Sequence, residues 1–268
     1  MPMDVNISLL GGFSVGVDGV TVPTDAWTRR YAASLVKLLA LSDGRRLHRE
    51  QVIDALWPGT SVDAAAPRLH KAAHYARRAI GGSVVLRIEL VMLLPDARVS
   101  VDAVEFRRRG SAALADGTKE AAEAALEVYG GLLLPDDLYE PWTDQPREVV
   151  RVLHADLLRC AARWHDLIRE HPADEQAHLA IVNALADKGD VRAALRQLER
   201  FDQALRRELG TAPSPDTERL RSSLLARTPE VKIPRQRLRT DSSGDVMSAT
   251  RSDSGSTAPT SVGGARHW

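Results

Sequence analysis

The feature that most restricts the fold of this chain is a long stretch of helical spacing, which runs from Val104 to about Ala226. Apolar residues recur there every three or four positions, as they do on one face of an α-helix. Short clusters of Gly, Pro, Asp and Ser interrupt the stretch at residues 116–117, 130–131, 135–137, 171–172, 189–190 and 213–215. Helices of about 12 to 20 residues joined by such turns predict paired-helix repeats, in which each helix buries its apolar face against a neighbour.

The segment 174–209 shows one predicted pair most clearly, with its turn at Gly189 and Asp190. The apolar residues are Ala177, Ile181 and Leu185 in the first helix and Ala193, Ala194, Leu198 and Phe201 in the second. Each of these two helices can hide its apolar side only by packing on the other.

The first 101 residues are organised differently. Alternating apolar residues over 5–17 and 20–22, around Gly11-Gly12 and Asp18-Gly19, predict a small antiparallel hairpin. Three helical patterns follow, at residues 31–41, 48–56 and 64–80, and after Gly81 the alternation returns over 84–88, 90–94 and 98–101. Strands, three helices and a terminal hairpin predict a winged helix-turn-helix.

These patterns predict a fold that is mainly α with a small β part. We expect a winged-helix DNA-binding domain over residues 1–101 and an α-helical, tetratricopeptide-like (TPR-like) repeat domain over residues 102–227. Residues 228–268 lose the apolar period and are rich in Ser, Thr, Gly, Asp and Pro, so we expect a disordered tail.

Cysteine content and apolar runs restrict the compartment. The single Cys160 excludes an internal disulfide framework and a multi-cysteine zinc site, which fits a reducing cytosol. The N-terminus has no basic segment followed by a long apolar run, and no apolar stretch approaches the length of about 18 residues that a membrane span needs. We therefore expect a cytoplasmic protein that is not associated with a membrane.

The charges are distributed unevenly, although the formal net charge is zero. Basic and acidic residues number 12 and 9 over residues 1–101, 18 and 23 over 102–227, and 6 and 4 over 228–268. The stretch 64–80 contains four basic residues and no acid. Basic residues grouped on one helix supply affinity for nucleic-acid phosphates.

The helix predicted at 64–80 has two distinct sides at 100° per residue. Its buried side would contain Leu69, Ala73, Ala76 and Ile80, and its opposite side Pro67, Lys71, His74 and Arg78, with Tyr75 beside them. We expect Lys71, His74, Tyr75 and Arg78 to approach base edges, and Arg68 and Arg77 to contact phosphates. The alternative is that these residues form the solvated basic face of an ordinary helix.

Other constellations do not predict chemistry. His70 and His74 lie one turn apart, but Lys71 stands where a metalloprotease motif needs Glu, and no Cys or acid lies nearby. Asp136 and Asp137 follow a proline and are interpreted as a turn or helix cap. Cys160 is interpreted as core packing, and no phosphate-binding loop is present. We therefore expect no catalytic residues, no metal and no cofactor, and so no enzyme.

Four ordered motifs between residues 5 and 226 resemble one known family. They are LHREQVIDALWP at 47–58, RLHKAAHYARRAIG at 68–81, YGGLLLP at 129–135 and ELGTAPSP at 208–215. In this order they are similar to the bacterial transcriptional activators related to the antibiotic regulatory proteins, the SARP-like family. Such proteins join an OmpR-type winged helix to a bacterial transcriptional activator domain of TPR-like repeats.

The resemblance implies binding to double-stranded promoter DNA, often as side-by-side dimers, and activation through RNA polymerase. The helix at 64–80 would enter the major groove, and the hairpin after Gly82, where we place a further DNA contact at Arg87, would follow the minor groove or backbone. The turn from Gly59 to Val62 would face the polymerase.

The sequence departs from the family pattern in three respects, and each departure leads to a separate expectation. Pro67 stands where a donor would begin the reading face, so the helix is expected to begin later, near Ala66, or to make one contact fewer. Ile88 and Glu89 occupy the hairpin tip, which predicts a longer, distorted or weakly binding wing. Larger relatives continue into an ATPase domain, so we expect a stand-alone or truncated regulator.

The sequence therefore predicts a DNA-binding transcriptional activator. The alternative is a protein-interaction module, in which the winged helix has lost DNA affinity and the helical repeats bind a peptide or another regulator.

Overall fold

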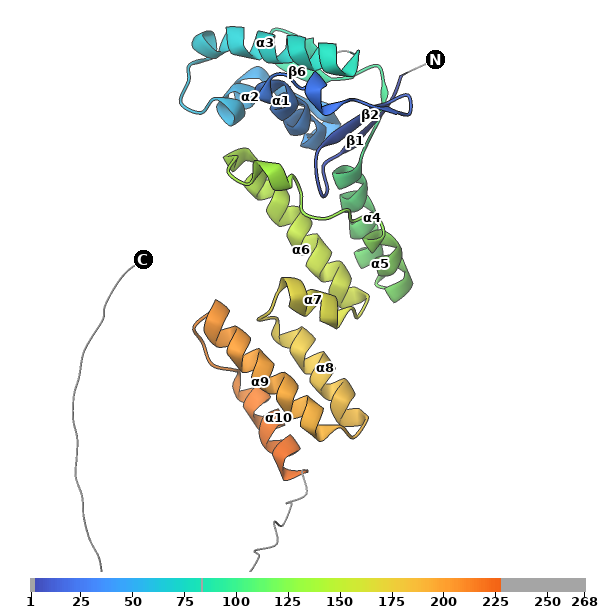
Figure 1. Cartoon of the computed structure of the whole chain (residues 1–268), viewed down its shortest axis with the longest axis vertical. Coiled ribbons are helices and arrows are strands. Elements are labelled where there is room, and N and C mark those ends of the chain that lie inside the picture. The colour runs from blue at the N-terminus through green and yellow to red at the C-terminus, as the bar shows by residue number, and fades with distance from the viewer. Residues whose placement is uncertain (1–2, 83, 228–268) are drawn as a thin grey trace, which may run out of the picture. The chain divides into compact units, whose positions relative to one another are not determined.

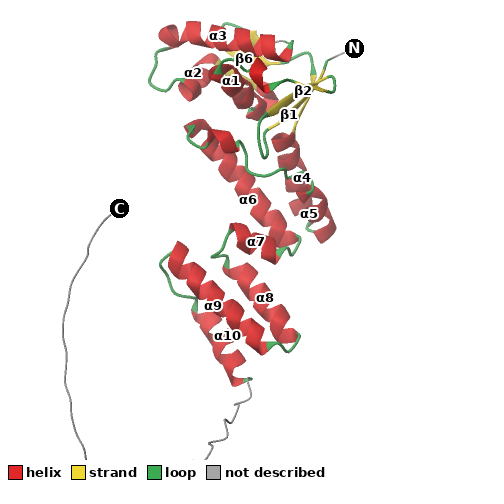
Figure 2. Ribbon diagram, in the orientation of Figure 1, coloured by secondary structure: helices red, strands yellow, loops and turns green. Residues whose placement is uncertain are grey.

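The computed structural model of the chain describes residues 3–82 and 84–227 (Figure 1). The strands lie in the first 101 residues and the longest run of helices follows them (Figure 2). The prediction of a mainly α fold with a small β part is confirmed. The tail predicted at 228–268 lies outside the described residues.

A four-stranded sheet opens the fold, in the order β3-β2-β1-β7. Its strands are β1 (Asp4–Ser8), β2 (Ser14–Val17), β3 (Val20–Thr21) and β7 (Arg98–Val101). The pairing of β1 with β2 is antiparallel, as the sequence predicts, whereas β7 runs parallel to β1 with Val5 opposite Val99. Alternate residues of β1, Val5 and Ile7, are buried because successive side chains of a strand point to opposite faces.

The winged helix-turn-helix follows this sheet. Its helices are α1 (Arg30–Leu41), α2 (Arg49–Leu56) and α3 (Val62–Ile80), with short 3₁₀ turns η1 (Thr24–Ala26) and η2 (Asp43–Arg45) at either end of α1. The hairpin of β5 (Val84–Leu86) and β6 (Leu90–Leu93) joins β4 (Arg46–His48) in a second sheet of order β4-β6-β5. Leu35 and Leu39 of α1, Val52 and Ile53 of α2 and Leu69 of α3 are buried in the core.

A helical array forms the remainder of the described chain. Its members are α4 (Asp102–Asp116), α5 (Lys119–Leu126), α6 (Asp144–Cys160), α7 (Trp164–Glu170), α8 (Glu175–Asp187), α9 (Val191–Glu208) and α10 (Pro215–Ala226). Consecutive helices pack against one another, and the pair predicted at 174–209 is α8 and α9 (Figure 1). Thr118, Asp174, Asp190 and Ser214 begin their helices by accepting a backbone N–H from the first turn. The paired-helix prediction is confirmed.

The apolar core crosses residue 101 without interruption. One buried cluster extends from Val5 in β1 to Ala177 in α8, and a smaller cluster lies within α8, α9 and α10. Asp102, the first residue of α4, supports this junction because its carboxylate accepts the N–H groups of Leu9 at 2.8 Å and Leu10 at 3.1 Å. The sheet and the helical array are therefore joined by both apolar packing and hydrogen bonds.

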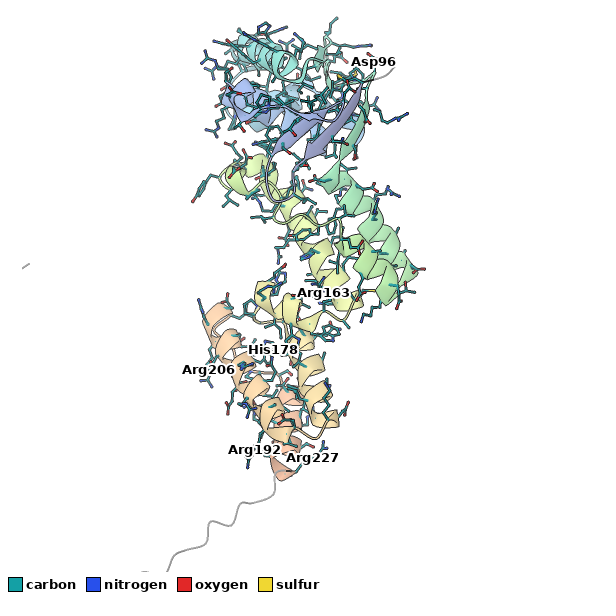
Figure 3. All side chains as sticks on the ribbon, turned by 45° about the vertical axis from the view of Figure 1, so that its right-hand side comes forward. Asp96, Arg163, His178, Arg192, Arg206 and Arg227 are labelled. Atoms are coloured by element: carbon teal, nitrogen blue, oxygen red, sulfur yellow. The ribbon has the colours of Figure 1, made fainter. Side chains whose placement is uncertain are left out.

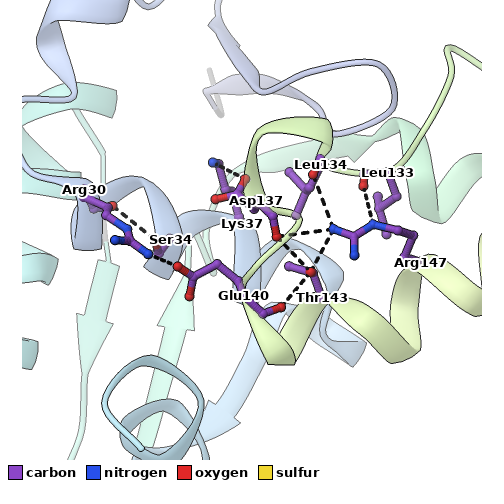
Figure 4. Close-up of polar contacts among 9 residues, drawn as sticks. All are labelled: Arg30, Ser34, Lys37, Leu133, Leu134, Asp137, Glu140, Thr143 and Arg147. Carbon is purple, nitrogen blue, oxygen red and sulfur yellow. Dashed lines mark hydrogen bonds and ion pairs between the residues drawn. The ribbon is translucent and has the colours of Figure 1, made fainter.

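A polar cluster fixes α1 to the segment between α5 and α6, which contains the 3₁₀ turns η3 (Pro135–Asp137) and η4 (Pro141–Thr143) (Figure 4). Lys37 Nζ donates to Asp137 Oδ2 at 2.6 Å, and Arg30 forms an ion pair with Glu140. Both partners of the first pair are nearly buried, with side chains 9% and 12% exposed. The turn expected at Asp136-Asp137 is present, and it serves to hold the α1 lysine.

Arg147 of α6 holds the same turn segment from the other side (Figure 4). Its guanidinium donates to the carbonyl oxygens of Leu133, Leu134 and Asp137 and to Thr143 Oγ1 at 2.9 Å. One arginine thus satisfies several acceptors in the short 3₁₀ turns and loops of this segment, which stabilises the contact with α1.

Candidate nucleic-acid interface

The helix α3 begins at Val62, two residues before the predicted start at Ala64 and well before Ala66. Ser61 starts it, because its hydroxyl accepts the N–H of Ala64 at 3.4 Å. Pro67 lies inside the helix, so the expectation of a later start was wrong. The fixed φ of proline is already helical, and its missing N–H leaves only the carbonyl of the exposed Asp63 without an intrahelical partner.

One face of α3 is buried and the other is open. The buried residues are Ala65, Leu69, Ala72, Ala73, Ala76 and Ile80, which include all four predicted from the sequence. The exposed residues of its middle and end include Pro67, Arg68, His70, Lys71, His74, Arg77 and Arg78. Gly81 ends the helix in the left-handed conformation at φ 70°, which a residue without a side chain adopts at little cost.

The exposed cations of α3 have no carboxylate partner. Within residues 3–82 and 84–227, none of Arg68, Lys71, Arg77 and Arg78 forms an ion pair. Their positive charge is therefore not neutralised locally. Such a face is complementary to a row of phosphates.

Arg77 has a structural partner that the sequence did not indicate. Its Nε donates to the carbonyl oxygen of Val84 at 2.7 Å. This bond ties the last turn of α3 to the first strand of the hairpin, while the side chain remains exposed. Arg77 thus positions the hairpin, and its availability for a phosphate is lower than that of Arg68 or Arg78.

Tyr75 is half-buried and stacks with charged and aromatic neighbours. Its ring lies 5.4 Å from that of His74 in an edge-on arrangement, and the Arg29 guanidinium lies over it at 5.5 Å. Arg29, Tyr75 and Arg78 line a pocket of about 650 Å³, together with Thr28. Tyr75 is therefore less free to reach a base than the sequence predicts, because part of its ring is used in packing.

Sequence reasoning missed Arg29 as a member of this surface. Its position just before α1 carries no local signal, since the contact with Tyr75 joins residues of α3 and the chain preceding α1. The structure adds a cation to the edge of the predicted face.

The hairpin is shorter than expected. Leu86 pairs with Val91, and the N–H of Arg87 donates to the Leu90 carbonyl at 2.7 Å, so Ile88 and Glu89 form a two-residue turn. Neither turn residue has a positive φ. The carbonyl of Glu89 also accepts the Arg49 N–H at 2.8 Å, which fixes the tip to the start of α2.

The expectation of a longer wing was therefore wrong. Arg87 lies on this hairpin and is exposed, as a DNA contact requires. Ile88 at the tip is 91% exposed, although its side chain is large and apolar.

The turn between α2 and α3 is anchored at its start and open at its end. Trp57 is 5% exposed and its ring lies 5.1 Å from that of Tyr31 on α1. Gly59 takes a positive φ of 74°, and Val62 at the start of α3 is 37% exposed. This places Gly59 and Val62 at the surface beside the cationic helix.

No alternative chemical site competes with this surface in the described residues. A search of residues 3–82 and 84–227 finds no group of three or more His, Cys, Asp or Glu side chains that could hold a metal ion. Cys160 is half-buried, with its Sγ 3.6 Å from the Thr118 carbonyl. None of the helices in this part of the chain combines the length and apolar character needed to cross a membrane.

Comparison with known families bears on the helical array. Residues 101–225 match the family described as the bacterial transcriptional activator domain. This match extends from α4 into α10, and the resemblance to SARP-like activators that the sequence motifs indicated is confirmed.

A solved structure shows the same fold. It is Mycobacterium tuberculosis EmbR in complex with a low affinity phosphopeptide, with a TM-score of 0.59 and 20% sequence identity. The match covers 85% of this chain, and this chain spans 66% of the length of the EmbR chain. The fold of this chain, a winged helix followed by a helical array, is thus similar to that of EmbR over the matched residues. Among curated proteins the comparison finds no match.

Proposed function

We propose that this protein is a DNA-binding transcriptional activator that binds promoter DNA through α3. Residues 1–101 would serve as the DNA-binding domain and residues 102–227 as the bacterial transcriptional activator domain. The observation that carries the proposal is the open cationic face of α3, on which Arg68, Lys71 and Arg78 have no carboxylate partner in the described chain. A helix that reads DNA needs one buried side and one solvent-facing side, and α3 has both.

Each exposed residue has a role that its chemistry supports. Lys71, His74 and Arg78 would approach base edges in the major groove, with Tyr75 at the margin of the contact. Arg68 would bind a phosphate, and Arg87 would bind the backbone beside the hairpin. Arg77 would act mainly by positioning the hairpin, because it already donates to Val84.

The partners follow from this role. The open turn from Gly59 to Val62 would contact RNA polymerase, and two copies would bind side by side on the promoter. The protein would act in the cytoplasm, without a cofactor and without catalysis.

Selection of DNA from a random-sequence pool tests the proposal. The purified full chain is mixed with random duplexes, and the bound fraction is amplified and sequenced. We expect a recurring sequence to be enriched. Lys71→Ala should change the preferred bases, whereas the matched variant Arg68→Ala should lower the recovery of all sequences alike. Absence of enrichment at low salt would contradict DNA reading.

One observation favours a second function, that of a protein-interaction module. The hairpin tip carries an exposed Ile88 beside the Glu89 carboxylate, and neither side chain suits a phosphate backbone. A chain that fails to enrich any DNA, yet binds a protein partner through the helical array, would support this alternative.

A further inference from the structure

Most surface arginines of the helical array follow one rule. In α4, α6, α7 and α10 they lie within one turn of a carboxylate and form an ion pair with it, and the exposed Arg107 of α4 is an exception. The pairs include Arg108 with Glu105, Arg151 with Glu148, Arg169 with Asp166 and Arg219 with Asp216. Every other helix of the array also has an acid in its first turn.

The helix α9 breaks both parts of this rule. Its first turn contains no acid. Four exposed arginines, which we call the α9 arginine row, have no ion pair among the described residues: Arg192, Arg196, Arg200 and Arg206. Arg200 has only a long hydrogen bond to the Gln197 amide, at 3.5 Å. Figure 3 labels Arg192 near the start of α9 and Arg206 near its end.

Helical geometry places the row on one side of α9. At 100° per residue its members fall within an arc of about 120°, and it spans about 21 Å at 1.5 Å per residue. The opposite side of α9 is buried through Ala194, Leu198, Phe201 and Leu205. Glu199 is the one acid within the arc, and no ion pair joins it to the row.

This arrangement does not favour the folding of the isolated chain. Arg192 lies in the first turn, where the positive end of the helix dipole repels a cation, and the Asp190 carboxylate before it caps the helix by accepting the Ala193 N–H and forms no ion pair with Arg192. Arg192 and Arg196, and then Arg196 and Arg200, repel each other at a spacing of four residues. A carboxylate in the first turn or four residues from an arginine would reduce the repulsion by the helix dipole and between the arginines, as carboxylates do elsewhere in the array.

We propose that the α9 arginine row binds an acidic segment of a partner protein, with carboxylates spaced one helical turn apart. Charge complementarity supports this partner. Arginines at successive four-residue intervals stand about 6 Å apart along the axis, which is the spacing of Asp or Glu residues on one face of a partner helix. Planar guanidinium groups also bind carboxylates through two parallel hydrogen bonds.

A nucleic-acid backbone fits the row less well. Phosphate contacts generally combine basic residues with hydroxyl or amide side chains and with the N-terminus of a helix. The row lies along the flank of α9, and Gln203 is the only neutral polar side chain within its arc. Glu199 would repel a continuous phosphate chain, whereas spaced carboxylates can avoid it.

A peptide-binding measurement tests the proposal on the full chain. The probe is a fluorescent synthetic helical peptide with Glu at every fourth position, compared with a peptide of the same composition in scrambled order and with a short DNA duplex. The row variant is Arg192→Gln/Arg196→Gln/Arg200→Gln. The matched control is Arg108→Gln/Arg169→Gln/Arg219→Gln, which removes the same charge from exposed, paired arginines.

The row variant should bind the ordered peptide about tenfold more weakly than the unmodified chain, because it cannot form three of the exposed charge pairs. The control should change the affinity less than about twofold, and the scrambled peptide should bind the unmodified chain more weakly than the ordered one. The thermal midpoint of the row variant should not fall, since its arginines repel one another, so weaker binding cannot be attributed to unfolding.

Four results would overturn the proposal. They are no binding of the ordered peptide at low salt, equal weakening by the two variants, equal affinity for the two peptides, and a row-dependent contact found only with the duplex. The last result would assign the row to nucleic acid. The proposed binding of promoter DNA through α3 would be unaffected by any of them.

Discussion

The cations of α3 and those of the helical array have different surroundings. On α3, Arg68, Lys71 and Arg78 form no ion pair within the described chain. On α4, α6, α7 and α10 most arginines are paired with acids one turn away. Exposed pairs contribute little to stability, so their main effect is to cancel charge at the surface. Within the described residues, the cations of α3 therefore keep a positive charge that these paired arginines do not.

The largest expected effect on stability comes from the nearly buried ion pair of Lys37 with Asp137, in contrast to these surface pairs. Replacing Lys37 by Ala leaves the Asp137 carboxylate nearly buried without its partner, and we expect a loss of about 3 to 5 kcal/mol in the free energy of unfolding. The exposed Arg219→Ala variant should cost less than about 1 kcal/mol. Urea unfolding of both variants measures the difference. Equal losses would show that burial does not distinguish the two kinds of pair.

The next largest loss of stability is expected at Asp102, because it joins the N-terminal sheet to the helical array. Asp102→Ala leaves the buried N–H groups of Leu9 and Leu10 without an acceptor, and should cost about 2 to 4 kcal/mol. Burial raises the pKa of Asp102, and the hydrogen bonds from Leu10, Leu9 and Ala103 oppose that change. Asp102→Asn keeps one acceptor and should cost clearly less. A loss as large for Asn as for Ala, measured by thermal unfolding, would contradict this role.

Histidine burial in the helical array predicts a smaller, pH-dependent effect. His178 is 1% exposed, and its two ring nitrogens are held by the Pro172 carbonyl and the Gln197 amide, an arrangement that suits the neutral ring. Burial lowers the pKa of His178. The unfolded chain therefore binds the proton more readily, and stability is full above pH 6.5 and falls as the pH drops below it.

The decrease should not exceed about 1.4 kcal/mol per pH unit for this one group. Denaturant unfolding between pH 7.5 and 5.5 measures it, and His178→Gln should flatten the profile. A stability that rises on acidification in this range would exclude the neutral buried ring.

The surface ion pairs themselves should have the smallest effect on the free energy of unfolding. Hydrogen bonds from Arg108 and Arg109 lower the pKa of Glu105 to about 2. The stability that Glu105 contributes is therefore present above pH 4.5 and disappears as the pH falls toward 2. Because Glu105 is largely in solvent, Glu105→Gln should cost less than about 0.5 kcal/mol at neutral pH. A larger loss in urea unfolding would mean that surface pairs do more than cancel charge.

Periodicity in the sequence was sufficient to locate the helices and the two sides of α3. Leu69, Ala73 and Ile80 are buried because the apolar period of the sequence matches that of the helix. The start of α3 was missed, since the capping hydroxyl of Ser61 outweighs the effect of Pro67 six residues later. Local patterns thus predict an element better than its boundary.

Contacts between distant residues could not be predicted in this way. The parallel pairing of β7 with β1 and the contact of Lys37 with Asp137, 100 residues apart, depend on the assembled fold. The hydrogen bond of Arg77 to Val84 and the cation–π contact of Arg29 with the Tyr75 ring also have no signal in the local sequence. The last two contacts decide how free the predicted DNA-binding side chains of Arg77 and Tyr75 remain.

The salt dependence of DNA affinity tests the central claim most directly. For the full chain on its selected duplex, Arg68→Ala should reduce the slope of log affinity against log salt by about 0.9, the change that accompanies one unneutralised phosphate. Arg108→Ala removes the same charge from a paired arginine of α4 and should leave the slope unchanged. An equal change in both variants, or no change for Arg68→Ala, would contradict the account.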